Sequence, residues 1–179
     1  MIKNEAILLH KKLKGKLEIK SKIHLKSKKE LSLLYMPGVA DVVKEIFIKN
    51  NPKDYTIKSN SVAIVTDGSR VLGLGNVGAE AAIPVMEGKS ILFKELGNID
   101  AFPICLKTQK TNEIINIIKN ISPVFGAINL EDIESPKCFE IEENLQNIGI
   151  PVMHDDQHGT AVVILAAIIN SCKIVKKDF

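Results

Sequence analysis

The sequence has 179 residues, of which 45% are hydrophobic and 25% charged, with a formal net charge of +3. This composition is typical of a globular chain, and the length suits one domain with at most a small appendage. The longest apolar run, AVVILAAII at residues 161–169, is well short of the roughly 20 residues that span a bilayer, so no membrane segment is expected. The N-terminus carries its lysines after a short apolar patch, unlike a secretory signal, which predicts a cytoplasmic location.

The charge is unevenly distributed. Residues 1–30 contain ten lysines and three acids, a charge of +7, so the remainder carries −4. This basic arm has no arginine and no aromatic residue that could stack on bases, so a solvated surface is favoured and no nucleic-acid partner is expected. Three cysteines, far apart and without a C-x-x-C pair, are expected to be reduced thiols. The only arginine of the chain is Arg70.

The predicted elements follow the chain in a regular order. A helical patch at residues 7–13 precedes an amphipathic helix at about residues 40–49. Strands are then predicted at residues 61–66, 90–95, 101–106, 124–129 and 150–154, and helices at residues 76–88, 112–120, 136–147 and 158–173. The last-but-one helix has Ser135 as its expected N-cap and Pro136 at its first position. This alternation predicts an α/β fold with a mainly parallel sheet flanked by helices, preceded by a helical N-terminal arm.

A glycine-rich stretch, VLGLGNVG at residues 71–78, matches the G-x-G-x-x-G fingerprint of dinucleotide-binding sheets. The turn-forming residues 66–69 separate it from the preceding strand, and Pro84 should keep the following helix short. Glu95, at the end of the next apolar run, stands where a ribose-binding acid belongs. Two interpretations stay open: a cofactor loop, or a close-packed backbone crossing that needs glycines.

Acidic residues follow two of the predicted strands, Glu131 and Asp132 after the first and Asp155 and Asp156 after the second. Ligands collect at the carboxyl ends of parallel strands, and carboxylates gathered there repel one another without a cation. Oxygen ligands favour Mg²⁺ or Mn²⁺. Adjacent strand residues point to opposite faces, so Glu131 and Asp132 can share an ion only if the chain has left the strand. Helix capping is the alternative role for these acids.

Several segments together resemble malic enzyme in its compact prokaryotic form: LSLLYMPGVA, VTDGSRVLGLGNVG, IPVMEGKSILFK, FGAINLEDI and PVMHDDQHGTAVVILAAIIN. The resemblance runs from about residue 15 to the end, and HDDQHGTA with NLEDI is its most distinctive part. It implies that residues 1–30 form a basic arm and residues 31–179 the N-terminal metal and substrate domain. It also implies that the glycine-rich stretch belongs to this domain, and that NAD or NADP is bound mainly by a C-terminal Rossmann-like domain absent from this chain.

The resemblance implies oxidative decarboxylation of L-malate to pyruvate and carbon dioxide with Mg²⁺ or Mn²⁺. The implied metal ligands are Glu131, Asp132 and Asp156, with Asp155 as a neighbour that tunes the site. The implied general base is Lys89, the general acid is Tyr35, and Arg70 holds the substrate carboxylate. Lys89 could serve as a base only if its pKa fell, which burial, Arg70 and the metal favour and the carboxylates oppose.

The isolated chain is expected to be inactive in malate oxidation, because the nicotinamide site lies mainly outside it. The family is commonly dimeric, so a homodimer is expected, in which the N-terminal arm could exchange between subunits. Two alternatives remain: a non-catalytic module for metal and dicarboxylate binding or for dimerisation, and a fragment of a malolactic enzyme. The preference for NAD or NADP is undetermined.

Overall fold

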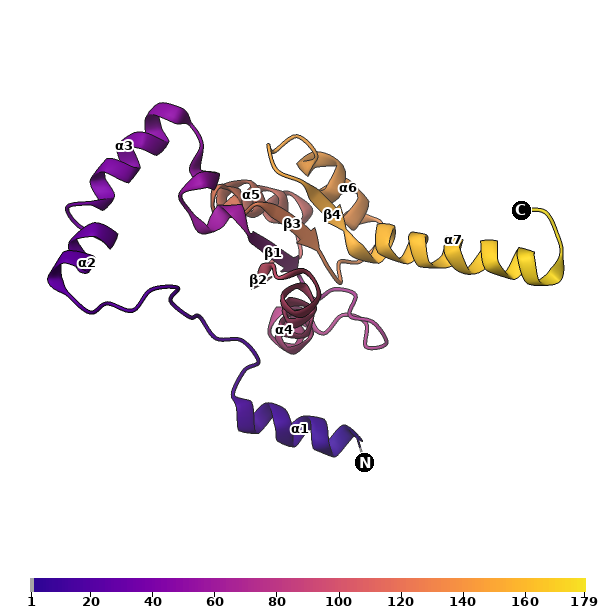
Figure 1. The fold of residues 1–179 in the computed structure, drawn as a ribbon. Helices are drawn as coiled ribbons and strands as arrows, with labels where there is room; N and C mark the ends of the chain where they lie inside the picture. The colour runs from indigo at the N-terminus through magenta and orange to yellow at the C-terminus, as the bar shows by residue number, and fades with distance from the viewer. Residues whose placement is uncertain (1) are drawn as a thin grey trace.

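The computed structural model describes residues 2–179 (Figure 1). Its helices are α1 (Ile2–Leu13), α2 (Lys28–Leu34), α3 (Val39–Lys49), α4 (Gly78–Gly97), α5 (Thr111–Ile121), α6 (Lys137–Leu145) and α7 (Asp155–Val175). Its strands are β1 (Ser61–Thr66), β2 (Asp100–Cys105), β3 (Ala127–Leu130) and β4 (Val152–His154). Short 3₁₀ turns occur at Pro52–Asp54, Ile57–Ser59 and Ser122–Val124.

The four strands form one parallel sheet in the order β2-β1-β3-β4. The central strand β1 is buried along its whole length, as its run of apolar residues predicts for a parallel sheet covered on both faces. Helices α5 and α6 pack on one face through Ile114, Ile118, Ile141 and Leu145. The α/β class and the parallel sheet predicted from the alternation are confirmed.

The register of the sheet determines where the acids lie. Val65 of β1 pairs with Leu130 of β3, and Leu130 pairs with His154 of β4. The carboxyl ends of β3 and β4 are therefore neighbours. The segments that follow these two strands emerge side by side at one edge of the sheet.

Helix α4 corrects two predictions. The strand predicted at residues 90–95 and the helix predicted at residues 76–88 are one continuous 20-residue helix, with Pro84 inside it. Its buried residues, Ala82, Met86 and Ser90, recur every four positions and form one stripe. Burial of that stripe outweighs the hydrogen bond that Pro84 removes. Glu95 is thus an exposed helix residue and does not end a strand.

The other predicted elements are confirmed with shifted ends. Strand β3 begins three residues later than predicted, and β4 is shorter at its start. Helix α6 begins at Lys137, with Pro136 in the N-cap position that was predicted for Ser135. Helix α7 begins at Asp155, three residues earlier than predicted. The second acidic pair therefore lies in the first turn of a helix and not in a loop.

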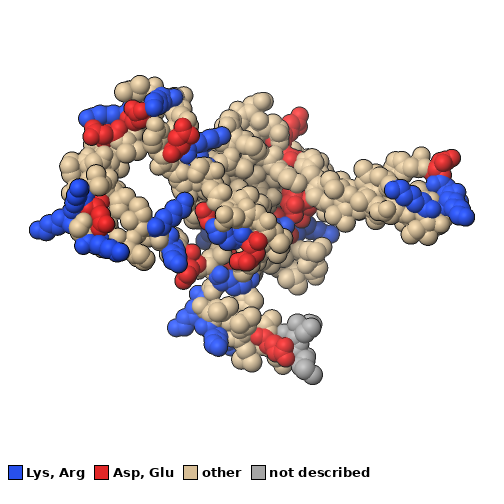
Figure 2. Space-filling view, viewed as in Figure 1, with Lys and Arg blue, Asp and Glu red and all other residues tan. Residues whose placement is uncertain are grey.

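Residues 2–49 form an arm that projects from the sheet domain (Figure 1). Lys16 anchors it to α4, since its Nζ donates to the Pro84 carbonyl at 2.6 Å and its backbone N–H to Glu87 Oε2 at 3.3 Å. In Figure 2 the basic side chains are spread along the arm and do not gather in one patch, which is consistent with a solvated surface. The arm also exposes large apolar side chains, including those of Leu33, Tyr35 and Phe47.

Helix α7 extends away from the sheet (Figure 1) and exposes apolar side chains along most of its length. Within residues 2–179 it is the one helix long and apolar enough to cross a membrane, by length and composition only. The expectation of no membrane segment stays a prediction, because a single helix of this kind is weak evidence for one. The first turn of α7 carries Asp155 and Asp156 and continues directly from β4, so this turn belongs to the sheet domain.

Candidate active site

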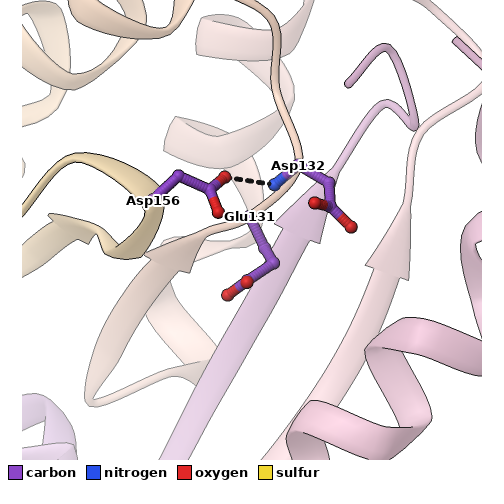
Figure 3. A group of neighbouring side chains, drawn as sticks. All are labelled: Glu131, Asp132 and Asp156. Atoms are coloured by element: carbon purple, nitrogen blue, oxygen red, sulfur yellow. Dashed lines mark hydrogen bonds between the residues drawn. The ribbon is translucent and has the colours of Figure 1, made fainter. Parts of the chain in front are cut away.

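A cluster of three carboxylates lies at the carboxyl edge of the sheet (Figure 3). Glu131 and Asp132 follow β3, and Asp156 comes from the first turn of α7. Each can offer a ligand oxygen such that the three atoms lie within 4.8 Å of one another. At Asp132 the backbone takes a φ of +54°, so the chain has left the strand. The condition under which adjacent acids can point to one ion is therefore met.

Hydrogen bonds hold the cluster in place. The backbone N–H of Asp132 donates to Asp156 Oδ2 at 2.8 Å (Figure 3), and Asn129 Nδ2 donates to Glu131 Oε2 at 2.8 Å. Asp132 Oδ2 is buried and has no hydrogen-bond partner among the residues that the structure describes. A buried carboxylate oxygen without a partner is costly. The donor set, three carboxylates with a free buried oxygen, thus fits a hard divalent cation.

Burial and mutual repulsion shift the pKa values of these acids in different directions. Burial raises the pKa of Glu131 to about 7, in spite of its hydrogen bonds from Asn129 and Lys89. Burial and the nearby Asp156 charge also raise the pKa of Asp132. The pKa of Asp156 is lowered, because the His154 ring and the hydrogen bond from the Asp132 N–H outweigh its burial. A cation that binds here below pH 7 therefore competes with a proton on Glu131.

Lys89 lies against the cluster from α4. Its Nζ is 2.7 Å from Asp155 Oδ2 and 3.1 Å from Glu131 Oε1. Burial lowers the pKa of Lys89, but the hydrogen bonds and charges of Asp155 and Glu131 outweigh it, so the pKa is raised. Without an ion in the site, the two carboxylates therefore outweigh burial and favour the charged form of Lys89.

Arg70 lies in a loop that is bonded to the carboxylate cluster, whereas Tyr35 lies on the projecting arm. The backbone N–H of Arg70 donates to the Asp132 carbonyl at 3.0 Å, so the loop that carries Arg70 is bonded to the cluster. Its exposed side chain forms no ion pair with the residues that the structure describes. Tyr35, at the end of α2, is 68% exposed on the projecting arm. Helix α2 lies on the projecting arm, away from the ends of β3 and β4 of the same chain (Figure 1).

The glycine-rich stretch lies in the loop 67–77 between β1 and α4. The predicted separation of the glycines from the strand is confirmed. A Cβ atom at Gly68 would lie 2.3 Å from the Gly78 carbonyl oxygen, so the backbone crosses itself closely at this point. Gly73 and Gly75 have positive φ values and line a tight turn closed by the Val71–Gly75 bridge. The close crossing accounts for Gly68, whereas a Cβ at Gly73, Gly75 or Gly78 would meet nothing within 4 Å, so positive φ values and not close packing account for the glycines of the stretch. The helix that follows is not short, contrary to expectation.

Two buried acids near the site were missed by the sequence analysis. Asp67, whose side chain is fully buried, pairs with Lys137 Nζ at 2.6 Å. Glu142 of α6 accepts from His158 Nε2 at 2.8 Å, so His158 faces α6, while His154 Nε2 lies 3.5 Å from Asp156. No spacing in the sequence signals either pair, because each joins separate elements.

Comparison with known proteins now identifies the family. A family model described as the N-terminal domain of malic enzyme matches residues 14–113 and 107–146. The chain belongs to the malic enzyme family. The family resemblance noted in the sequence is thereby confirmed.

Individual malic enzymes match nearly the whole chain. A bifunctional malic/malolactic enzyme of Bacillus subtilis is 53% identical over 99% of this chain and 44% of its own length. An NAD-dependent malic enzyme of Geobacillus stearothermophilus is 55% identical over 98% of this chain and 37% of its own length. The crystal structure of malic enzyme from Pyrococcus horikoshii superposes with a TM-score of 0.91 at 50% identity, over 99% of this chain and 42% of that one. The chain thus spans less than half the length of these relatives.

Proposed function

We propose that this chain forms the metal- and substrate-binding part of a malic enzyme, which converts L-malate and NAD⁺ or NADP⁺ to pyruvate, carbon dioxide and the reduced nucleotide. The observation that carries the proposal is the carboxylate cluster of Glu131, Asp132 and Asp156, with the ion-paired Lys89 beside it. The family membership supports it. The cofactors would be Mg²⁺ or Mn²⁺ and a nicotinamide nucleotide.

The residues of the chain would divide the work by their charges and positions. Glu131, Asp132 and Asp156 would hold the divalent ion, which when bound would acidify the malate hydroxyl and stabilise negative charge on the substrate. Arg70 would bind a substrate carboxylate. Lys89 would accept the hydroxyl proton at Nζ, while Asp155 orients it. Since Lys89 is protonated beside two carboxylates, it would first have to release that proton to solvent, which a bound cation would favour by offsetting the carboxylate charge. The neutral amine could then accept the hydroxyl proton. Tyr35 would then protonate the product carbon.

The nicotinamide nucleotide would be bound mainly outside these 179 residues. Relatives named NAD-dependent and NADP-dependent malic enzymes both match this chain, so the comparisons do not favour one nucleotide. We predict that the isolated chain does not oxidise malate. Malolactic chemistry is a second candidate, since one relative is named a bifunctional malic/malolactic enzyme. Analysis of whether the full-length enzyme releases pyruvate or lactate separates the two.

The metal site is tested by thermal unfolding of the chain with Mn²⁺, with and without L-malate, for the wild type and Asp156→Asn. Mn²⁺ is expected to raise the Tm of the wild type, because an ion that binds only the folded state stabilises it. Asp156→Asn should lose most of this shift, since it removes one of three charged ligands. Asp41→Asn is the matched control, because Asp41 is exposed on α3, and it should keep the full shift. Equal shifts in all three proteins, or none in the wild type, would reject the site.

We further propose a homodimer in which the arm of each subunit supplies Tyr35 to the site of the other. Tyr35 does not reach the cluster of its own chain, and α2 and α3 expose apolar side chains that a monomer would leave in water. Contiguous exposed apolar surfaces of this kind mark protein interfaces. Burial of the arm against a second copy would both cover these side chains and complete the site.

Mixing two inactive variants tests this arrangement in the full-length enzyme. Tyr35→Phe and Lys89→Ala place their defects in different sites of a mixed dimer if Tyr35 acts across the interface, so one site is intact. Unfolding and refolding the variants together should then recover about a quarter of wild-type activity, because about half of the dimers are mixed and each has one intact site. No recovery, with mixed dimers demonstrated by differential tags, would mean that Tyr35 acts within its own subunit.

A further inference from the structure

Glu142 is a buried acid that the proposed chemistry does not use. It lies on the inner face of α6 and is only 8% exposed. One of its oxygens, Oε1, accepts two hydrogen bonds, from the backbone N–H of His154 at 3.0 Å and from His158 Nε2 at 2.8 Å. Both donors belong to the junction where β4 turns into α7. A single carboxylate of α6 is therefore hydrogen-bonded to the segment that carries Asp155 and Asp156.

The start of α7 lacks a cap of its own. His154 occupies the N-cap position and its side chain makes no capping hydrogen bond. The N-terminus of a helix has unpaired N–H groups and a partial positive charge, which an acid stabilises. Asp155 and Asp156 are such acids within the first turn of α7, and Glu142 adds another from a neighbouring helix. This explains why α6 buries a carboxylate at a position where its pattern would favour an apolar residue.

Two successive contacts relate Glu142 to the carboxylate cluster, one from Glu142 to His154 and one from His154 to Asp156. His154 is 3% exposed, and its Nε2 lies 3.5 Å from Asp156 Oδ2. The same Asp156 oxygen accepts the backbone N–H of Asp132 at 2.8 Å. The backbone N–H of His154 is thus bonded to Glu142, and its ring lies beside Asp156 without a hydrogen bond between the two side chains. A shift of the junction between β4 and α7 would therefore displace Asp156 relative to Glu131 and Asp132.

We propose that Glu142 is a positioning residue of the cation site, which acts through His154 and the first turn of α7 to hold Asp156 in place. The inference rests on the proposed function, since it presumes a cation at the cluster. Glu142 itself touches no ligand oxygen of the cluster. Partners that orient metal ligands typically contribute 10- to 100-fold to metal affinity, and an effect of about that size is expected here.

The test is the affinity of the 179-residue chain for Mn²⁺ alone, measured by electron paramagnetic resonance of the free ion at a temperature where every variant is folded. Glu142→Ala should weaken Mn²⁺ binding by about 10- to 100-fold. Glu142→Gln retains an oxygen that can accept the His154 N–H, and should recover most of the affinity. Glu140→Ala, at an exposed acid of the same helix, is the matched control and should bind as the wild type does.

The outcomes separate this inference from the proposed function. A wild type that binds Mn²⁺ and a folded Glu142→Ala that binds it equally well would overturn the positioning role alone. A wild type that binds no Mn²⁺ would overturn the proposed cation site and this inference with it. Should Glu142→Ala not fold, Glu142→Asp carries the same test, because its carboxylate is one methylene too short to reach both donors. A lower Tm in Glu142→Ala with unchanged Mn²⁺ affinity would assign Glu142 to helix packing only.

Discussion

Replacing Lys89 with alanine in the full-length enzyme is expected to lower kcat for malate decarboxylation by about 10³-fold, within the range that a positioned acid or base contributes. Lys89 Nζ is the one amine bonded to both Asp155 and Glu131 among the described residues. The affinity of Lys89→Ala for Mn²⁺ should rise, although its kcat falls. The reason is that Glu131 and Asp155 lose the positive charge that competes with the ion.

The opposite signs of these two effects distinguish a catalytic loss from a damaged site. Lys94→Ala is the matched control, because Lys94 lies on the same helix and pairs with Asp100 away from the cluster. It should leave both kcat and Mn²⁺ affinity unchanged. Steady-state kinetics of the full-length enzyme and Mn²⁺ titration of the variants provide the measurements. A Lys89→Ala enzyme with near-normal kcat would contradict the assignment of the base.

Replacing Lys137 with alanine is expected to lower the free energy of unfolding by roughly 3–5 kcal/mol, the typical cost of removing one partner of a buried ion pair. The Asp67 side chain is completely buried, and Lys137 Nζ lies 2.6 Å from its Oδ2. Without Lys137 that carboxylate would have no compensating charge. Urea unfolding of the isolated chain, followed by circular dichroism, measures the loss.

The same pair supports the loop that carries Arg70. Asp67 Oδ1 accepts from the backbone N–H and the hydroxyl of Ser69, and Ser69 Oγ accepts the backbone N–H of Glu134 at 2.9 Å. Lys110→Ala, which breaks an exposed pair with Glu113, is the control and should cost well under about 1 kcal/mol. A similarly small cost for Lys137→Ala would show that the pair at Asp67 is not a determinant of stability.

The helix at 78–97 shows why local patterns could not locate every element. The run SILFKEL has the apolar content of a strand, and Pro84 suggested that a helix would end before it. The outcome depended on whether Ala82, Met86 and Ser90 could form one buried stripe. That stripe exists only when β1 and β2 are in place beneath it. Packing therefore overrode a local signal that was physically correct.

For the two acidic pairs, by contrast, the local sequence correctly predicted the position of the site. Their places directly after two apolar segments were visible in the sequence, and parallel strands bring such ends to one edge. The register of β3 against β4 then placed Leu130 beside His154, which makes Glu131 and Asp156 neighbours. The left-handed backbone at Asp132 and the first turn of α7 set the directions of the side chains. These details depend on contacts between segments 24 residues apart.

The sequence by itself determined the α/β class, the mainly parallel sheet, the family and the acids that gather at the sheet edge, because these depend on apolar periodicity and on short motifs. Only the tertiary structure decided the charge state of Lys89, the raised pKa of Glu131, the Asp67–Lys137 pair and the hydrogen bonding of Glu142 to the start of α7. Each of these is set by burial and by distances between residues far apart in the chain. Electrostatic energies depend steeply on both quantities, and neither can be read from local sequence.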